Sequence, residues 1–332
     1  MGKAGRPFRA LIAALAAFVV LSVCGCSVAG IELSPKSVSD AKQAEVDALS
    51  PSLSTPTIKE SGKLIVGVNL NAQAPFVVRS DTGELSGMDI DLASALGNQL
   101  GLQVSFVGLT STTDSAAADC DIVMGFGSSS SETLMLVGSY AEDATAFFHR
   151  GDATVVSASD LANAKVGLQA GSASERALNE SGLVMTQNEF DNLNDAFDAL
   201  ESGTVDYVLC DAYSGGYLAA VYSDIHVAGT LDVPESIGIG VAMDNTQLQT
   251  SVQQALNELS SNGVLDLVRA RWVGDMAQLT TESQVTGLDA VSADAATGTD
   301  AASTDGTSTD GTSTDATASD GTTSTDETAA AA

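Results

Sequence analysis

The chain has 332 residues, enough for two domains of ordinary size, and 44% of them are hydrophobic, as in a globular protein. Its formal net charge is -30, which argues against a nucleic-acid partner because a phosphate backbone is bound by basic residues. Two of the cysteines, Cys24 and Cys26, lie near the N-terminus. The other two, Cys120 and Cys210, are either free or bridged, and a chain of this size needs no disulfide to stabilise its core.

The N-terminal segment has the pattern of an export signal. Three basic residues precede an apolar run over 10–23, which is too short for a membrane span. Residues 23–26 (Val-Cys-Gly-Cys) resemble a bacterial lipobox, and Cys26 fits the acceptor position better than Cys24, which follows a bulky valine. The resemblance implies that 1–25 is a lipoprotein signal peptide and that Cys26 carries several acyl chains as a stable membrane anchor. An ordinary cleaved signal with incidental cysteines is the alternative.

Both ends of the chain beyond this signal are predicted to lack a core. Residues 26–61 are rich in Ser, Pro, Ala and Lys and are predicted to be a flexible tether. Residues 277–332 are predicted to be a disordered tail. After Ala293 the tail consists of small and polar residues, which cannot offset the entropy of the free chain. Aspartates recur there, but their spacing matches no known calcium loop.

Between these ends, strand and helix patterns alternate. An apolar run over 64–68 predicts a strand, and Asp89 is predicted to cap a helix that ends at Gly101. Further apolar runs, at 121–126 and 205–211, predict buried strands. This alternation indicates an α/β fold, in which ligands bind at the carboxyl ends of strands and the N-termini of helices.

Polar residues occupy several of those positions. Ser128 and Ser130 follow a predicted strand, and Ser172 precedes the N-terminus of a helix, where free N–H groups suit an anionic group. Asp211 ends the strand over 205–211, where a carboxylate can pair with a cation on a ligand. The alternative for the serines is a plain loop or helix start, and for Asp211 a helix cap or turn.

From about 62 to 274 the chain resembles the extracellular solute-binding proteins, family 3, of bacterial polar amino-acid ABC transporters. No single motif is specific, but their order and spacing along the chain are typical of this family. The motifs are Leu-Ile-Val-Gly at 64–67, Pro-Phe at 75–76, Gly-Met-Asp-Ile-Asp-Leu at 87–92, Val-Gly-Leu-Gln-Ala-Gly-Ser at 166–172, Val-Asp at 205–206, Asp-Ala at 211–212, Asn-Gly at 262–263 and Arg-Trp-Val-Gly at 271–274.

The resemblance implies a two-lobed, type II periplasmic-binding-protein-like fold with two crossover hinge strands. Lobe 1 is expected over 62–147 and 240–276, and lobe 2 over 148–239, with the lobes closing around the ligand. It also implies a monomer that delivers a small molecule to ABC permease subunits outside the cytoplasm, held at the membrane through Cys26. We expect no cofactor, no metal and no nucleic acid.

The chain also departs from the family pattern. Members that bind amino acids clamp the ligand carboxylate with an arginine, and Thr133 stands at that place. Gln73 replaces the aromatic residue expected before the Pro-Phe motif, and a second aromatic is missing around 110–112. The ligand-binding residues implied by the resemblance are Gln73, Phe76, Ser128, Ser130, Thr133, Ser172 and Asp211.

Three functional hypotheses follow. The first is a receptor for a small polar solute, amino-acid-like or cationic, anchored by Asp211 and with Arg79 or Arg150 as a relocated clamp. The second is a degenerate member acting as a scaffold or sensor partner. The third is a dehydratase-like enzyme on the same fold, but no nucleophile–base pair is evident and His149 and His226 are isolated, so we expect no enzyme. The sequence determines neither the ligand nor the cognate permease.

Overall fold

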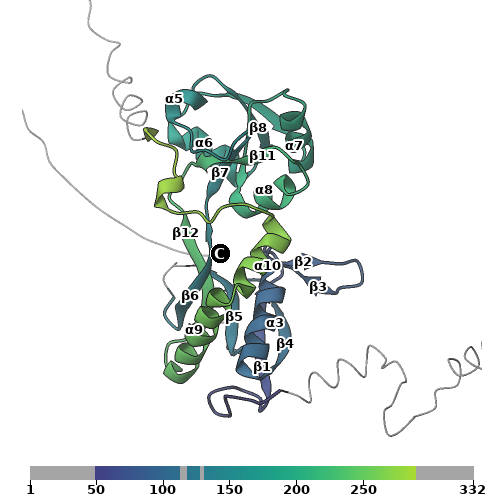
Figure 1. Ribbon diagram of the computed structural model, residues 1–332, viewed down its shortest axis with the longest axis vertical. Coiled ribbons are helices and arrows are strands. Elements are labelled where there is room, and N and C mark those ends of the chain that lie inside the picture. Colours follow the sequence, from purple (N-terminus) through teal and green to yellow (C-terminus); the bar gives the residue numbers. More distant parts are fainter. Residues whose placement is uncertain (1–48, 113–117, 128–130, 289–332) are drawn as a thin grey trace, which may run out of the picture.

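The computed structural model describes residues 49–112, 118–127 and 131–288, which form two α/β lobes, each built on a five-stranded sheet (Figure 1). The predicted fold class is confirmed. In the first sheet the neighbours of β1 are parallel to it, while β12 runs antiparallel to both β5 and β6. Its strands are, in spatial order, β4 (Gln103–Leu109), β1 (Lys63–Asn69), β5 (Ile122–Gly127), β12 (Glu235–Ala242) and β6 (Leu134–Asp143).

Three helices cover the first sheet, and a small hairpin extends from it. The hairpin pairs β2 (Val78–Arg79) with β3 (Leu85–Ser86). The helices are α3 (Met88–Leu100), α9 (Thr246–Ser261) and α10 (Val264–Val273).

The second sheet belongs to lobe 2 and has helices on both faces. Its strands are, in spatial order, β11 (Ile225–Thr230), β7 (Thr145–Arg150), β10 (Tyr207–Asp211), β8 (Lys165–Gln169) and β9 (Thr186–Phe190). Its helices are α5 (Ala158–Leu161), α6 (Ala173–Ser181), α7 (Leu193–Glu201) and α8 (Ala212–Ala219).

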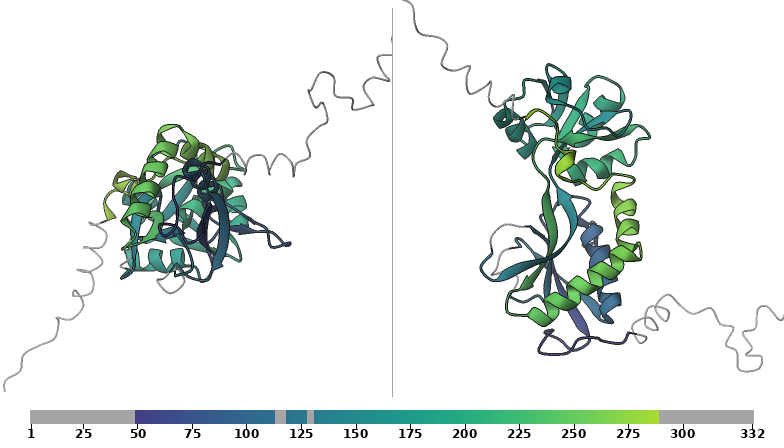
Figure 2. Two further views of the ribbon diagram at one scale, coloured as in Figure 1. Left: turned by 90° about the horizontal axis from the view of Figure 1, so that it is seen from below. Right: turned by 60° about the vertical axis from the view of Figure 1, so that its left-hand side comes forward.

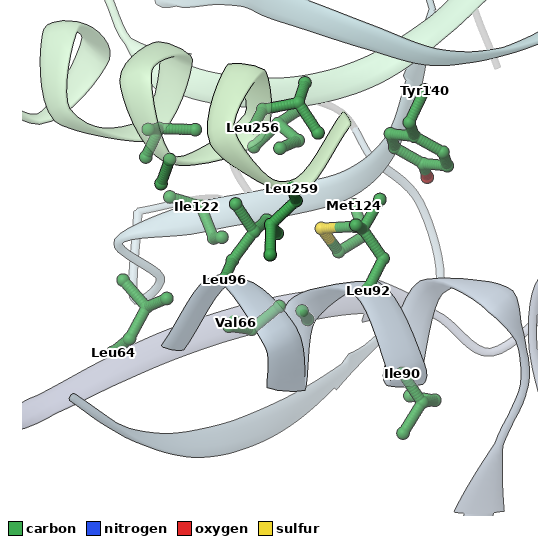
Figure 3. Close-up of a cluster of buried hydrophobic side chains, with 14 of the residues drawn as sticks. Leu64, Val66, Ile90, Leu92, Leu96, Ile122, Met124, Tyr140, Leu256 and Leu259 are labelled. Carbon is green, nitrogen blue, oxygen red and sulfur yellow. The ribbon is translucent and has the colours of Figure 1, made fainter. Parts of the chain in front are cut away.

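Helix α3 illustrates how the sequence builds lobe 1. It ends at Gly101, whose φ of 68° places it in the left-handed region that favours glycine, as the sequence predicts. The residue at its N-cap is Gly87 rather than Asp89, so the predicted capping role of Asp89 is wrong. Leu92 and Leu96 are fully buried and point into the same cluster as side chains of α9 (Figure 3).

The chain crosses between the lobes close to the predicted boundaries, but not at them. Strand β6 ends at Asp143 and β7 begins at Thr145, so the first crossing lies near Ala144 rather than at 147. The second precedes Glu235, because the whole of β12 pairs with β6 in the first sheet. An apolar run shows that a strand is buried, but it does not show which sheet the strand joins.

A third connection follows α10. Residues 274–288 run from the end of α10 to lobe 2 and pack on it (Figure 2, right). Leu279 and Val285 are buried there, and the N–H of Val285 donates to the carbonyl of Thr230 at 2.9 Å. A short 3-10 helix (Thr281–Ser283) lies between them. The predicted tail therefore does not begin at 277.

The predicted tether also includes residues that belong to lobe 1. Leu53 and Ile58 are buried in its core, and the N–H of Lys59 donates to the Asp121 carboxylate at 2.8 Å. Both ends of the fold were predicted to be flexible because single apolar residues in a polar segment form no periodic pattern.

Cys120 and Cys210 are both buried and free. Cys26 and the rest of both predicted flexible ends lie outside the described residues.

Candidate functional site between the lobes

A cavity of about 410 Å³ lies between the lobes where strands of both sheets end. A recess of about 170 Å³ adjoins it and shares four of its lining residues. Clefts of this kind, at the carboxyl ends of strands in an α/β fold, are where such folds bind small molecules. Polar residues lining the cleft are Gln73, Asp143, Thr145, Gln169, Ser172, Ser174, Asp211, Asp232, Glu235 and Ser236.

Lobe 2 presents two helix N-termini to the cleft. Ser172 caps α6, its hydroxyl accepting the N–H of Glu175 at 3.1 Å, and Asp211 caps α8, its carboxylate accepting the N–H of Ser214 at 2.7 Å. Each was predicted either to bind a ligand or to cap a helix. The caps fix the two side chains and leave further lone pairs on each for a ligand.

Asp143 lies beside Asp211 and is a cleft residue that the sequence did not indicate. It ends β6, and its buried carboxyl group forms a hydrogen bond with that of Asp211. Burial and the hydrogen bond and charge of Asp211 raise the pKa of Asp143 to about 9. A second carboxyl group beside it and burial both disfavour the charged form of Asp143 unless a cation lies next to it.

Asp89 lies at the recess and is 1% exposed. Its Oδ1 accepts the hydroxyl proton of Tyr140 at 2.5 Å, and the Tyr140 oxygen in turn accepts the N–H of Gly125 at 2.8 Å. Its Oδ2 has no partner among the described residues. Burial raises the pKa of Asp89 to about 7, although the Tyr140 hydrogen bond opposes this shift.

Gly125 keeps the space beside the Asp89 Oδ2 open. Its φ is 69°, and a Cβ at this position would come within 3.3 Å of that oxygen. A left-handed backbone and a close approach both favour glycine.

Gln73 and Phe76 lie on the loop that faces α8. Gln73 lines both cavities, and its Oε1 accepts the Ser214 hydroxyl at 3.2 Å across the lobe boundary. Phe76 lines the recess and packs on Tyr213, with ring centroids 4.8 Å apart. The structure thus brings four of the predicted ligand-binding residues together: Gln73, Phe76, Ser172 and Asp211.

The remaining predicted residues are not placed in the cleft. Thr133 is exposed, its carbonyl accepts the N–H of Met243 at 2.8 Å, and it lines neither cavity. Ser128 and Ser130 lie outside the described residues. The two arginines considered as a relocated clamp, Arg79 and Arg150, are exposed and also line neither cavity.

The charged side chains of the cleft therefore have one sign. Within the described part of the chain, the residues lining the two cavities include five carboxylates and no lysine, arginine or histidine. Such a surface attracts cations and repels a free carboxylate. Among the described residues no group of three His, Cys, Asp or Glu side chains is arranged to hold a metal ion.

The order of strands, the two lobes and the cleft at their junction define a solute-binding protein. The chain belongs to the bacterial extracellular solute-binding proteins, family 3, which match residues 64–275. Members of this family are extracytoplasmic or periplasmic solute-binding proteins.

Two curated relatives and one solved structure show how far the similarity extends. The L-cystine-binding protein TcyJ of Escherichia coli (strain K12) is 25% identical, over 65% of this chain and 85% of its own length. The ABC transporter glutamine-binding protein GlnH of Bacillus subtilis (strain 168) is 23% identical, over 80% of this chain and 96% of its own. A polar amino acid ABC uptake transporter substrate-binding protein from Streptococcus thermophilus has the same fold, with a TM-score of 0.57, 20% identity and coverage of 67% and 89%.

No described helix is both long enough and apolar enough to cross a membrane.

Proposed function

We propose that this protein binds a small polar solute with a cationic amino group and delivers it to an ABC importer. The observation that carries the proposal is the pair of carboxylates of Asp143 and Asp211 in an inter-lobe cleft whose described lining has no positive side chain. An ammonium group seated there satisfies both carboxylates with charge-assisted hydrogen bonds, each stronger than a neutral one. The relatives named for binding cystine and glutamine also take ligands that carry an amino group.

The architecture supports closure of the lobes around this solute. The cleft lies beside the two crossing strands, and its walls come from both sheets. Hinge closure between two lobes sequesters a ligand from water and strengthens its electrostatic contacts. The bond from Ser214 to Gln73 already joins the two walls. In this proposal the protein acts by binding, not catalysis, and as a monomer.

A ligand screen tests the proposal. The full-length protein is melted with L-amino acids, small amines and small organic acids, and a ligand at a hundredfold excess over its dissociation constant adds about 2.7 kcal/mol of stability. We expect compounds with an amino group to raise the melting temperature and organic acids without one to leave it unchanged. A shift with acids alone, or with none of the compounds, contradicts the proposal.

The second hypothesis, a degenerate member that serves as a scaffold or sensor partner, retains one specific argument. The neutral Thr133 stands outside both cavities, so the described cleft lacks the cation that clamps an amino-acid carboxylate. A screen without any stabilising compound favours this hypothesis.

Membrane attachment is a separate part of the proposal. The N-terminal pattern supports a lipid anchor at Cys26, which would hold the receptor outside the cytoplasm beside its permease subunits. We expect Cys26→Ser to move the protein from the membrane fraction to the aqueous fraction after cell fractionation, with Cys24→Ser as the matched control. Membrane association that is unchanged in Cys26→Ser would refute the anchor.

A further inference from the structure

The recess beneath the Asp143–Asp211 pair is built from three carboxylates on three separate elements. Asp89 comes from α3, Asp143 from the end of β6 and Asp211 from the end of β10, and all three line the same cavity of about 170 Å³. The core that surrounds the recess is apolar.

One oxygen in this recess, the Oδ2 of Asp89, has no hydrogen-bond partner among the described residues, and Asp89 is 1% exposed. Buried polar atoms in native proteins are nearly always paired, so an unpaired acceptor that faces a cavity indicates a donor that enters it. Tyr140 does not fill this role, because its single proton goes to the other oxygen of Asp89.

The other walls limit what the donor can be. Ala72, Phe76 and Ile237 give the recess an apolar side that suits methylene groups. The free space is larger than the ~30 Å³ that one water molecule occupies. An anion is disfavoured by the carboxylates, and the described residues that line the recess include no cation to receive one. The group that matches an unpaired carboxylate oxygen at the end of a short apolar passage is an ammonium on an alkyl chain.

We propose that the recess is a second ammonium subsite and that the solute is a diamine-like cation with a short apolar chain between its two charges. One ammonium lies at Asp211 in the open cleft, and the other reaches the Asp89 oxygen. Asp143 lies between them and selects for the doubly charged solute. This inference rests on the proposed function, since it assigns the first ammonium to the site described above.

Titration calorimetry on the full-length protein tests the subsite. The probes are linear diaminoalkanes with three to six carbons and the n-alkylamines of the same lengths. We expect the best diamine to bind at least about tenfold more tightly than its matched alkylamine, a difference of about 1.4 kcal/mol.

Two variants locate that preference. Asp89→Asn keeps an oxygen for the Tyr140 hydroxyl and removes the charge, and Asp143→Asn removes the charge between the subsites. We expect each to abolish most of the diamine preference. The matched control is Asp91→Asn, on the same helix but outside the recess, where the carboxylate pairs with Arg271 and Trp272.

The outcomes separate the two proposals. Equal affinity for diamines and alkylamines, or a diamine preference that survives in Asp89→Asn, overturns the second subsite and leaves the amine receptor standing. Failure of every amine to bind the folded wild-type protein overturns both. A diamine preference that is lost in Asp89→Asn and kept in Asp91→Asn supports the inference.

Discussion

The two lobes contribute to the cleft in different ways. The lobe 2 groups already have partners: Asp211 and Ser172 cap helices, and Asp232 accepts the N–H of Thr145 at 2.7 Å. On the lobe 1 side, the buried Oδ2 of Asp89 has no partner among the described residues, and the buried carboxyl group of Asp143 has the carboxyl group of Asp211 beside it. Hydrogen bonds within lobe 2 therefore hold its cleft residues in place before a ligand binds. The lobe 1 side has a carboxylate oxygen that can still accept a hydrogen bond from a ligand.

The cores differ as well. Lobe 1 has one large cluster under α3, α9 and α10, with a small second cluster on the other face of its sheet. Lobe 2 has a substantial cluster on each face, and the segment after α10 adds Leu279 to one and Val285 to the other. Lobe 1 thus has its main core on one face of its sheet, whereas lobe 2 has a core on both faces.

Removing the carboxylate of Asp211, on the lobe 2 side of the cleft, has the largest expected effect. Asp211→Asn retains a side-chain oxygen for the Ser214 N–H, so we expect the fold to survive. Loss of one member of a buried charge pair costs about 2–5 kcal/mol, and amine binding should weaken at least about thirtyfold. Calorimetry measures the affinity and thermal melting checks the fold. Undiminished affinity would mean that lobe 1 alone anchors the ligand.

The packing of the segment after α10 on lobe 2 gives the next largest expected effect. Leu279 is 4% exposed, and truncating a buried leucine to alanine costs about 2–5 kcal/mol. We expect Leu279→Ala to lower the free energy of unfolding by that order in a urea titration. Gln278→Ala, at the neighbouring exposed position, is the control and should cost much less. Equal stability of Leu279→Ala and wild type would show that the segment does not hold lobe 2.

The raised pKa values of the two buried lobe 1 carboxyl groups predict a smaller effect, a dependence of the free energy of unfolding on pH. Burial raises the pKa of Asp89 to about 7 and that of Asp143 to about 9. The folded protein therefore binds more protons than the unfolded chain above about pH 4, and its stability falls as the pH rises toward 9. Asp211 and Asp232 act on Asp143, and Asp143 acts in turn on Tyr213, whose other charged neighbours are Arg269 and Glu142.

Asp143→Asn removes the larger part of this dependence. Without ligand, we expect it to be more stable than wild type at pH 8 by on the order of 1 kcal/mol, with the difference shrinking at pH 5. Urea titrations at the two pH values measure the effect. Glu142→Gln makes the same change of charge at the adjacent residue, and a similar gain in that control would show that only net charge matters.

The sequence predicted the fold because the fold depends on patterns that local residues express. Apolar runs mark the strands, the helix of 88–100 ends at a glycine, and the order of weak motifs matches one family. The segment at 277–288 was missed because isolated apolar side chains and backbone hydrogen bonds hold it to lobe 2, and neither gives a periodic pattern in the sequence.

The site was predicted in part for a similar reason. Ser172 and Asp211 follow strands, a position that points to a ligand in any α/β fold. Asp143 gave no such signal, because its importance comes from a neighbour 68 positions away in the chain, Asp211. Asp89 stood in a motif that fits a helix start, and the direction of its side chain depends on Tyr140, which no local pattern reveals.

The described chain enters through one lobe and leaves through the other. Ser52 is tied to the end of α3 by its N–H, which donates to the carbonyl of Leu100 at 3.0 Å, whereas Leu288 packs on the core of lobe 2. A spectroscopic label at each of these two places would therefore sit on different lobes. If the lobes close as proposed, the distance between the two labels shortens or lengthens with closure and can be measured without changing a residue of the cleft.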